Sequence, residues 1–109
     1  MDYSDYSDFE INRRVAELLG KFEYVSDCNH NGGSSVLCDS IRSCQEFDPC
    51  NDPSDAWPII LDNRISITST SEEERPWCAY RWGDNCEAWG VNPLRQCMIV
   101  YLMMKEGAE

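Results

Sequence analysis

The stretch NPLRQCMIVYLMMK, residues 92–105, decides the fold of this chain of 109 residues. Asn92 is a favourable N-cap residue, and Pro93 suits the first helical position, where its missing N–H leaves no hydrogen bond unmade. Apolar residues then follow at helical spacing on one face, and the other positions are also largely apolar. That face comprises Leu94, Cys97, Met98, Tyr101 and Leu102. We therefore expect a helix over about residues 93–105 at the centre of the core.

A second helix is predicted near the other end of the chain, over about residues 8–19. Ser7 and Glu10 have the spacing of a capping box, in which each side chain pairs with a backbone N–H of the first turn. Ile11 and Val15 follow at helical spacing and would face the core. The sequence therefore predicts one helix close to each end.

Between the helices we expect a β-hairpin over about residues 58–68. Residues 58–61 and 64–68 flank Asp62-Asn63, and both residues of this pair tolerate the positive φ that a two-residue turn requires. Trp57 precedes a proline, which favours extended geometry, and we expect its side chain in the core with the hairpin.

The remaining segments give weaker signals. Residues 77–82 alternate loosely and favour a further strand. Residues 26–45 and 83–90 are rich in turn-forming residues and are interpreted as loops, with a short strand at Val36-Leu37 as the alternative within the first of them. We expect residues 1–109 to form a single domain. The predicted class is α+β, in which the hairpin and one or two short strands pack as a small antiparallel sheet against the two helices.

The charge balance is strongly acidic. Nine Lys and Arg against twenty Asp and Glu give a formal net charge of −11. Such a field disfavours direct binding of nucleic acid or of an anionic membrane, because both require a basic surface. A basic protein partner is favoured instead, and the alternative is that the acidity serves solubility alone. The oligomeric state is left open.

Seven cysteines are many for this length. An odd number leaves one thiol unpaired, and the acidic start MDYSDYSDFE lacks the basic and apolar regions of a secretion signal. We therefore expect free thiols in a reducing cytoplasm.

A zinc site is the alternative that the cysteines raise. Zinc requires four converging ligands, and closely spaced pairs such as Cys-x₂-Cys supply them most readily. The chain has no such pair, so a site would have to draw on the widely spaced Cys28, His30, Cys38, Cys44 and Cys50. We expect instead that no metal or other cofactor is bound, and that these thiols are small buried groups or incidental surface residues.

No catalytic arrangement is predicted. His30 is the only histidine, and it lies in a stretch rich in Gly, Ser and Asn beside Cys28. No motif that would form an oxyanion hole accompanies the pair. We therefore expect a binding protein and not an enzyme.

Two groups of residues are candidates for contact with a partner. Asp48, Asp52 and Asp55 combine negative charge with turn-forming ability, and their alternative role is to cap a helix or stabilise turns. Trp82 and Trp89 lie among Gly, Asp and Asn, where an indole suits an exposed interface as well as a core.

Three segments resemble a known family. They are SDFEINRRVAELLG (Ser7–Gly20), FDPCNDPSDAWPIILDNRISI (Phe47–Ile67) and NPLRQCMIVYLMMKE (Asn92–Glu106). Together, and in this order, they resemble the NinX-like small proteins of lambdoid, P22-type bacteriophages and their prophages. The intervening segments 24–46 and 69–91 hold most of the cysteines and are not part of the resemblance.

The resemblance implies a phage-encoded accessory protein, expressed early in infection in the cytoplasm of the bacterial host, and it implies no catalytic residues. We expect an acidic accessory protein that binds and modulates a host or phage protein. The alternative is a zinc- or thiol-dependent protein that uses the Cys28–Cys50 region.

Overall fold

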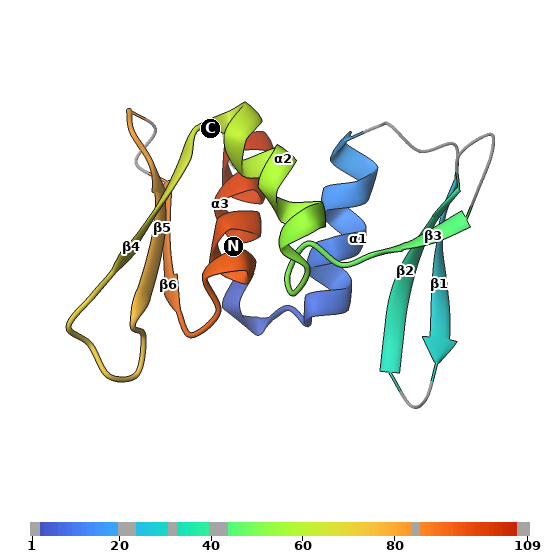
Figure 1. The fold of residues 1–109 in the computed structure, drawn as a ribbon, viewed down its shortest axis with the longest axis horizontal. Helices are drawn as coiled ribbons and strands as arrows, with labels where there is room; N and C mark the ends of the chain where they lie inside the picture. The colour runs from blue at the N-terminus through green and yellow to red at the C-terminus, as the bar shows by residue number, and fades with distance from the viewer. Residues whose placement is uncertain (1–2, 20–23, 31–32, 40–43, 84–85, 107–109) are drawn as a thin grey trace.

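The computed structural model describes residues 3–19, 24–30, 33–39, 44–83 and 86–106, and over residues 24–46 it describes the backbone. The helices are η1 (Tyr3–Asp5), α1 (Asp8–Leu19), α2 (Pro53–Asn63) and α3 (Pro93–Glu106). The strands are β1 (Tyr24–His30), β2 (Gly33–Asp39), β3 (Cys44–Phe47), β4 (Ile65–Ser69), β5 (Trp77–Arg81) and β6 (Cys86–Gly90). They form two antiparallel sheets, β1-β2-β3 and β4-β5-β6, with the α-helices between them (Figure 1). The predicted α+β class is confirmed.

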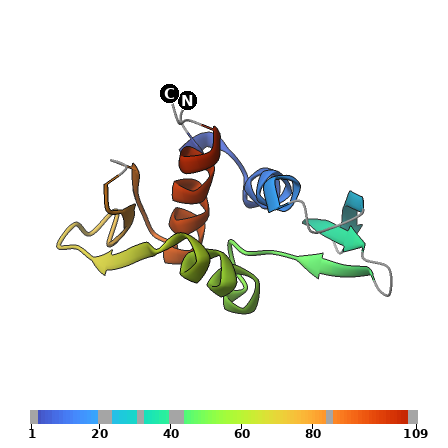
Figure 2. The ribbon, with the colours of Figure 1, turned by 90° about the horizontal axis from the view of Figure 1, so that it is seen from above.

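Helix α3 is central to the core, as predicted. Every residue from Gln96 to Leu102 is buried, and Met98 and Leu102 are fully enclosed. The sheet β4-β5-β6 lies on one side of α3, and α1 and α2 lie on the other (Figures 1 and 2). The predicted cap is also confirmed, because Asn92 Oδ1 accepts the N–H of Leu94 at 3.0 Å.

Helix α1 has the predicted start and end. The capping box is present: the N–H of Glu10 donates to Ser7 Oγ at 3.1 Å, and the N–H of Ser7 donates to Glu10 Oε1 at 3.4 Å. Ile11 and Val15 are fully buried against the core. The far end of α3 is tied to α1 by Arg14, which forms an ion pair at 3.0 Å with Glu106.

The hairpin predicted over about residues 58–68 is wrong, because its first half belongs to α2. Arg64 ends this helix in the left-handed conformation, with φ 53°, and its N–H donates to the backbone oxygens of Ile60 and Leu61. Strand β4 begins at the next residue and pairs with β5. The Asp62-Asn63 pair is therefore the last turn of a helix.

Burial explains why α2 is favoured over a strand. Ala56, Ile59 and Ile60 are buried, and their spacing is that of one helical face. Pro58 lies inside the helix on its exposed side, where it removes one intrahelical hydrogen bond. The expected burial of Trp57 is also wrong, since its side chain is 53% exposed on the same side.

Two segments interpreted mainly as loops form strands, and the short strand left open at Val36-Leu37 is part of β2. Residues 26–45 contribute to β1, β2 and β3, and residues 86–90 form β6. Few apolar residues alternate along these segments, so the period of two that marks a half-buried strand is weak. The strand predicted over residues 77–82 is confirmed as β5.

Candidate protein-binding surface

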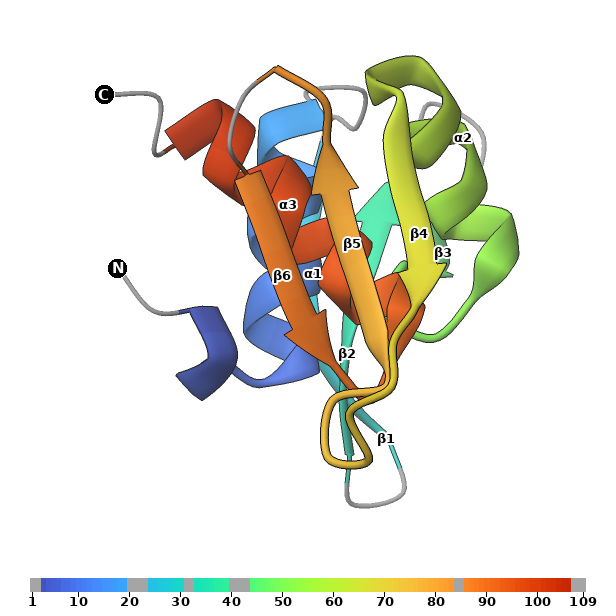
Figure 3. The same cartoon turned by 90° about the vertical axis from the view of Figure 1, so that its left-hand side faces the viewer.

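The sheet β4-β5-β6 has one face toward the core and one toward the outside. Ala79 on β5 lies opposite Ala88 on β6, and both are buried. Side chains alternate between the faces of a strand, so the neighbours of these alanines point away from the core. Figure 3 views the sheet from that outer side, with α3 behind it.

Aromatic side chains gather on this outer face. Tyr80 and Trp89 lie at outward positions of β5 and β6, and Trp82 follows directly after β5. Trp82 is 78% exposed, and its ring meets that of Tyr80 edge to face, with centroids 5.7 Å apart. We call the surface formed by Tyr80, Trp82, Glu87 and Trp89 the aromatic face.

Glu87 brings a carboxylate into this surface. It is exposed and lies opposite Tyr80 in the register, two residues before Trp89 on the same strand. Burial raises the pKa of the Cys78 thiol, and the charge of Glu87 raises it further. Cys78 lies opposite Trp89, so this electrostatic effect agrees with a carboxylate on the same side of the sheet.

A guanidinium group already contacts one ring of the aromatic face. Arg75, in the β4–β5 loop, lies over the ring of Trp89 at 5.5 Å from its centroid. The same guanidinium pairs with Glu72 at 2.9 Å. The loop is held locally by Thr70, whose N–H donates to the backbone oxygen of Pro76 at 2.8 Å.

The three candidate aspartates lie together where α2 begins. Asp48 accepts a hydrogen bond from Asn12 Nδ2 at 2.6 Å. Asp52 caps α2 by accepting a backbone N–H at 2.9 Å. Asp55 accepts the N–H of Asp48, also at 2.9 Å. These carboxylates therefore stabilise the turn at residues 48–52 and the first turn of α2.

The same turn joins the starts of the other two helices. Asn92, the cap of α3, donates from Nδ2 to the backbone oxygen of Cys50 at 2.7 Å. Asp8, the first residue of α1, accepts from Arg95 Nη1 at 2.6 Å and from Asn51 Nδ2 at 3.2 Å. All three α-helices therefore begin beside the turn, on the opposite side of α3 from the sheet β4-β5-β6 (Figure 1).

Asp55 is expected to stabilise the protein more at low pH than at neutral pH, which is the reverse of the usual effect of a carboxyl group. Burial, followed by the charges of Asp52 and Asp48, raises its pKa above the ordinary value of 3.8. The folded protein therefore binds this proton more tightly than the unfolded chain, and the stabilising contribution of Asp55 declines as pH rises through the folded-state pKa. In Asp55→Asn this contribution is absent, while an amide oxygen still accepts the N–H of Asp48.

We expect wild type to gain stability relative to Asp55→Asn when the pH falls from about 7 to about 4. The measurement is urea unfolding of both proteins at each pH. A stability difference that is independent of pH, or that changes in the opposite direction, would contradict this assignment.

The residues of the zinc alternative lie on several elements. Cys28 and His30 are on β1, Cys38 is on β2 and Cys44 begins β3, and their side chains lie outside the described part of the structure. Cys50 is fully buried, and burial raises the pKa of its thiol strongly. Among the described residues, no group of three or more His, Cys, Asp or Glu side chains could hold a metal ion.

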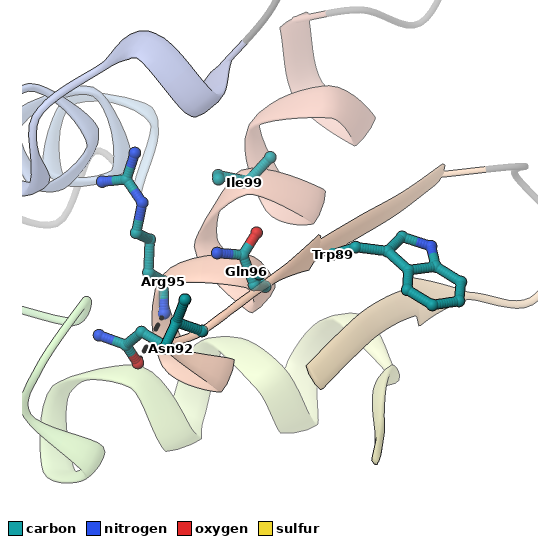
Figure 4. A pocket seen from close by; sticks show the side chains of 7 residues that line it. Trp89, Asn92, Arg95, Gln96 and Ile99 are labelled. Carbon is teal, nitrogen blue, oxygen red and sulfur yellow. Dashed lines mark hydrogen bonds between the residues drawn. The ribbon is translucent and has the colours of Figure 1, made fainter. Parts of the chain in front are cut away.

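A pocket of about 240 Å³ lies where β6 meets the start of α3. It is lined by Trp89, Gly90, Val91, Asn92, Arg95, Gln96 and Ile99, a set without a carboxylate, histidine or thiol. Figure 4 shows Arg95 directed toward the N-terminal segment and Trp89 directed away from Ile99. A Cβ at position 90 would overlap the Gln96 side chain as it stands, so a larger residue here would require that side chain to move. Two polar groups of the pocket serve the fold, because Asn92 caps α3 and Arg95 pairs with Asp8.

The structure thus brings Trp82 and Trp89 onto one face and adds two residues that sequence reasoning missed. Tyr80 and Glu87 are recognised only through the β5–β6 register, which the sequence does not specify. A partial signal was present, because Cys78, Tyr80 and Trp82 occur at every second position of the predicted strand.

These features define a small acidic α+β protein with an exposed aromatic sheet face. The chain belongs to the family of bacteriophage P22 NinX, whose family model matches residues 2–105. The match extends across residues 24–46 and 69–91, so the membership covers more of the chain than the three resembling segments. No curated protein matches the chain. Among the described residues, no helix is both long and apolar enough to cross a membrane.

Proposed function

We propose that this phage NinX-family protein is a non-catalytic accessory protein that binds and modulates a basic host or phage protein through the aromatic face. Its place of action would be the cytoplasm of the bacterial host. The observation that carries the proposal is the 78% exposure of Trp82. An indole that stays largely in water contributes little to the stability of the fold. Burial of roughly 200 Å² of its surface against a partner would contribute several kcal/mol to the free energy of binding.

The residues around Trp82 favour an interface more strongly than a single exposed tryptophan would. Tyr80 contacts Trp82 edge to face, and Trp89 lies farther along the same face of a paired sheet, so the rings are presented on backbone held by hydrogen bonds. Tyrosine and tryptophan are enriched among the residues that dominate binding energy at protein interfaces. The rival patch holds a single aromatic ring and consists of Trp57 with Leu61 one helical turn later on α2, 53% and 57% exposed.

The charge of the chain supports a basic partner. A net charge of −11 creates a long-range field that attracts a cationic surface and repels an anionic one. Glu87 places part of this charge on the aromatic face, and the exposed Glu73 and Glu74 add more in the β4–β5 loop. Association with such a partner should slow as salt is added, because the attraction is screened.

Photo-crosslinking in the bacterial host tests this proposal. A photoreactive phenylalanine derivative is placed at position 82 in one variant and at position 57 in a second, so that each probe replaces an exposed indole. We expect the probe at position 82 to form a covalent adduct with one basic protein, and the probe at position 57 to form none with that protein. An adduct from position 57 alone, or adducts with unrelated proteins from both positions, would overturn the proposal.

A further inference from the structure

We propose that the aromatic face is a receptor for an arginine side chain of the partner, which lies against the rings of Tyr80 and Trp82 and pairs with Glu87. This inference rests on the proposed function and specifies the chemistry of the residue that the face recognises. It follows from three features of the surface, which are the position of Glu87, the contact of Arg75 with Trp89, and the charge of the surroundings.

Glu87 lies among the aromatic residues and not at the margin of the face. It is opposite Tyr80 in the β5–β6 register and shares its strand and its face with Trp89. Trp82 meets the ring of Tyr80 edge to face at a centroid distance of 5.7 Å. A cation that pairs with the Glu87 carboxylate would therefore be within reach of the π-faces of aromatic rings.

The molecule provides its own example of the proposed contact. The guanidinium of Arg75 lies over Trp89 and at the same time pairs with Glu72 at 2.9 Å. A ring face and a carboxylate together thus hold one guanidinium at the edge of the aromatic face. Tyr80, Trp82 and Glu87 offer the same two chemical groups, in this case to a residue from outside the chain.

Arginine fits this combination better than lysine. A guanidinium is planar, so it can stack on a ring while its N–H groups donate in the same plane to a carboxylate. An ammonium group is more strongly hydrated and lacks the planar fork of donors. The net charge of −11, with Glu73 and Glu74 exposed in the β4–β5 loop at the Trp89 end of the sheet, favours a partner segment in which the arginine lies among other basic residues.

Titration with model peptides tests the inference on the full chain. The probes are a blocked Gly-Arg-Gly-Arg-Gly peptide and its lysine and citrulline analogues, and the readout is the indole N–H signals of the four tryptophans in ¹⁵N-labelled protein. We expect the arginine peptide to shift the Trp82 signal in a saturable manner and to leave Trp57 unchanged. The lysine peptide should bind about threefold more weakly, and citrulline, which is uncharged, should not saturate.

Two variants of equal charge change provide the control. Glu87→Gln should weaken binding of the arginine peptide by about threefold or more, whereas Glu17→Gln, an exposed residue on α1, should leave it unchanged. Equal binding of all three peptides, or equal effects of the two variants, would overturn the arginine receptor. If crosslinking from position 82 still captured a partner, the proposed function would survive that result, so the two failures are distinguishable.

Discussion

Leu102→Asp is expected to abolish cooperative folding. Leu102 lies on α3 in the middle of the core and is fully buried, as is Met98 one turn before it. An aspartate at this position would place an unpaired charge among apolar side chains, at a cost of several kcal/mol. Because domains of this size have a free energy of unfolding of about 5–15 kcal/mol, that loss removes most or all of the stability. The measurement is thermal and urea unfolding followed by circular dichroism.

The matched control is Leu61→Asp on α2. It makes the same chemical change at a side chain that is 57% exposed, and we expect a loss of less than about 1 kcal/mol. If Leu102→Asp folded with a cooperative transition close to that of Leu61→Asp, the placement of α3 at the centre of the core would be incorrect.

Asn12→Ala is expected to lower the free energy of unfolding by about 3 kcal/mol. Asn12 is a buried polar residue of α1, and both polar atoms of its side-chain amide bind the turn at residues 48–52. Its Nδ2 donates to Asp48 at 2.6 Å, and its Oδ1 accepts the N–H of Cys50 at 3.1 Å. Alanine would leave the Cys50 N–H unsatisfied in a buried site and would remove a hydrogen bond to a charged group.

Glu17→Ala on the exposed side of the same helix is the comparison, and its expected change is within about 0.5 kcal/mol. Urea unfolding of the two variants and wild type measures both effects. Similar small changes in the two variants would show that the turn is held by its other contacts, such as the hydrogen bond from Asn92 to Cys50.

The parts of the fold that could be predicted are those that carry local signals. Ser7 with Glu10 and Asn92 with Pro93 mark helix starts through backbone chemistry within one turn, and both helices are confirmed. Helix α2 was missed because Pro58 and the Asp62-Asn63 pair are typical of a hairpin when considered alone. Burial of one helical face against α3 outweighs those local preferences.

The residues of the candidate site also differ in how far the sequence could predict them. Trp82 and Trp89 could be identified as possible interface residues from their polar neighbours, but their common face depends on the β5–β6 register. Glu87 carried no signal of its own in the sequence. Asp48, Asp52 and Asp55 looked equally suited to a partner, and their role in the turn became apparent only with their hydrogen bonds.

The central claim is that the aromatic face binds the partner, and the dissociation constant of the crosslinked partner tests it most directly. Isothermal titration calorimetry compares wild type, Trp82→Ala and Trp57→Ala, after circular dichroism has confirmed that all three are folded. We predict that Trp82→Ala weakens binding about tenfold or more, as expected for a dominant interface tryptophan, and that Trp57→Ala binds like wild type. An unchanged dissociation constant for Trp82→Ala, with a loss for Trp57→Ala, would contradict the account.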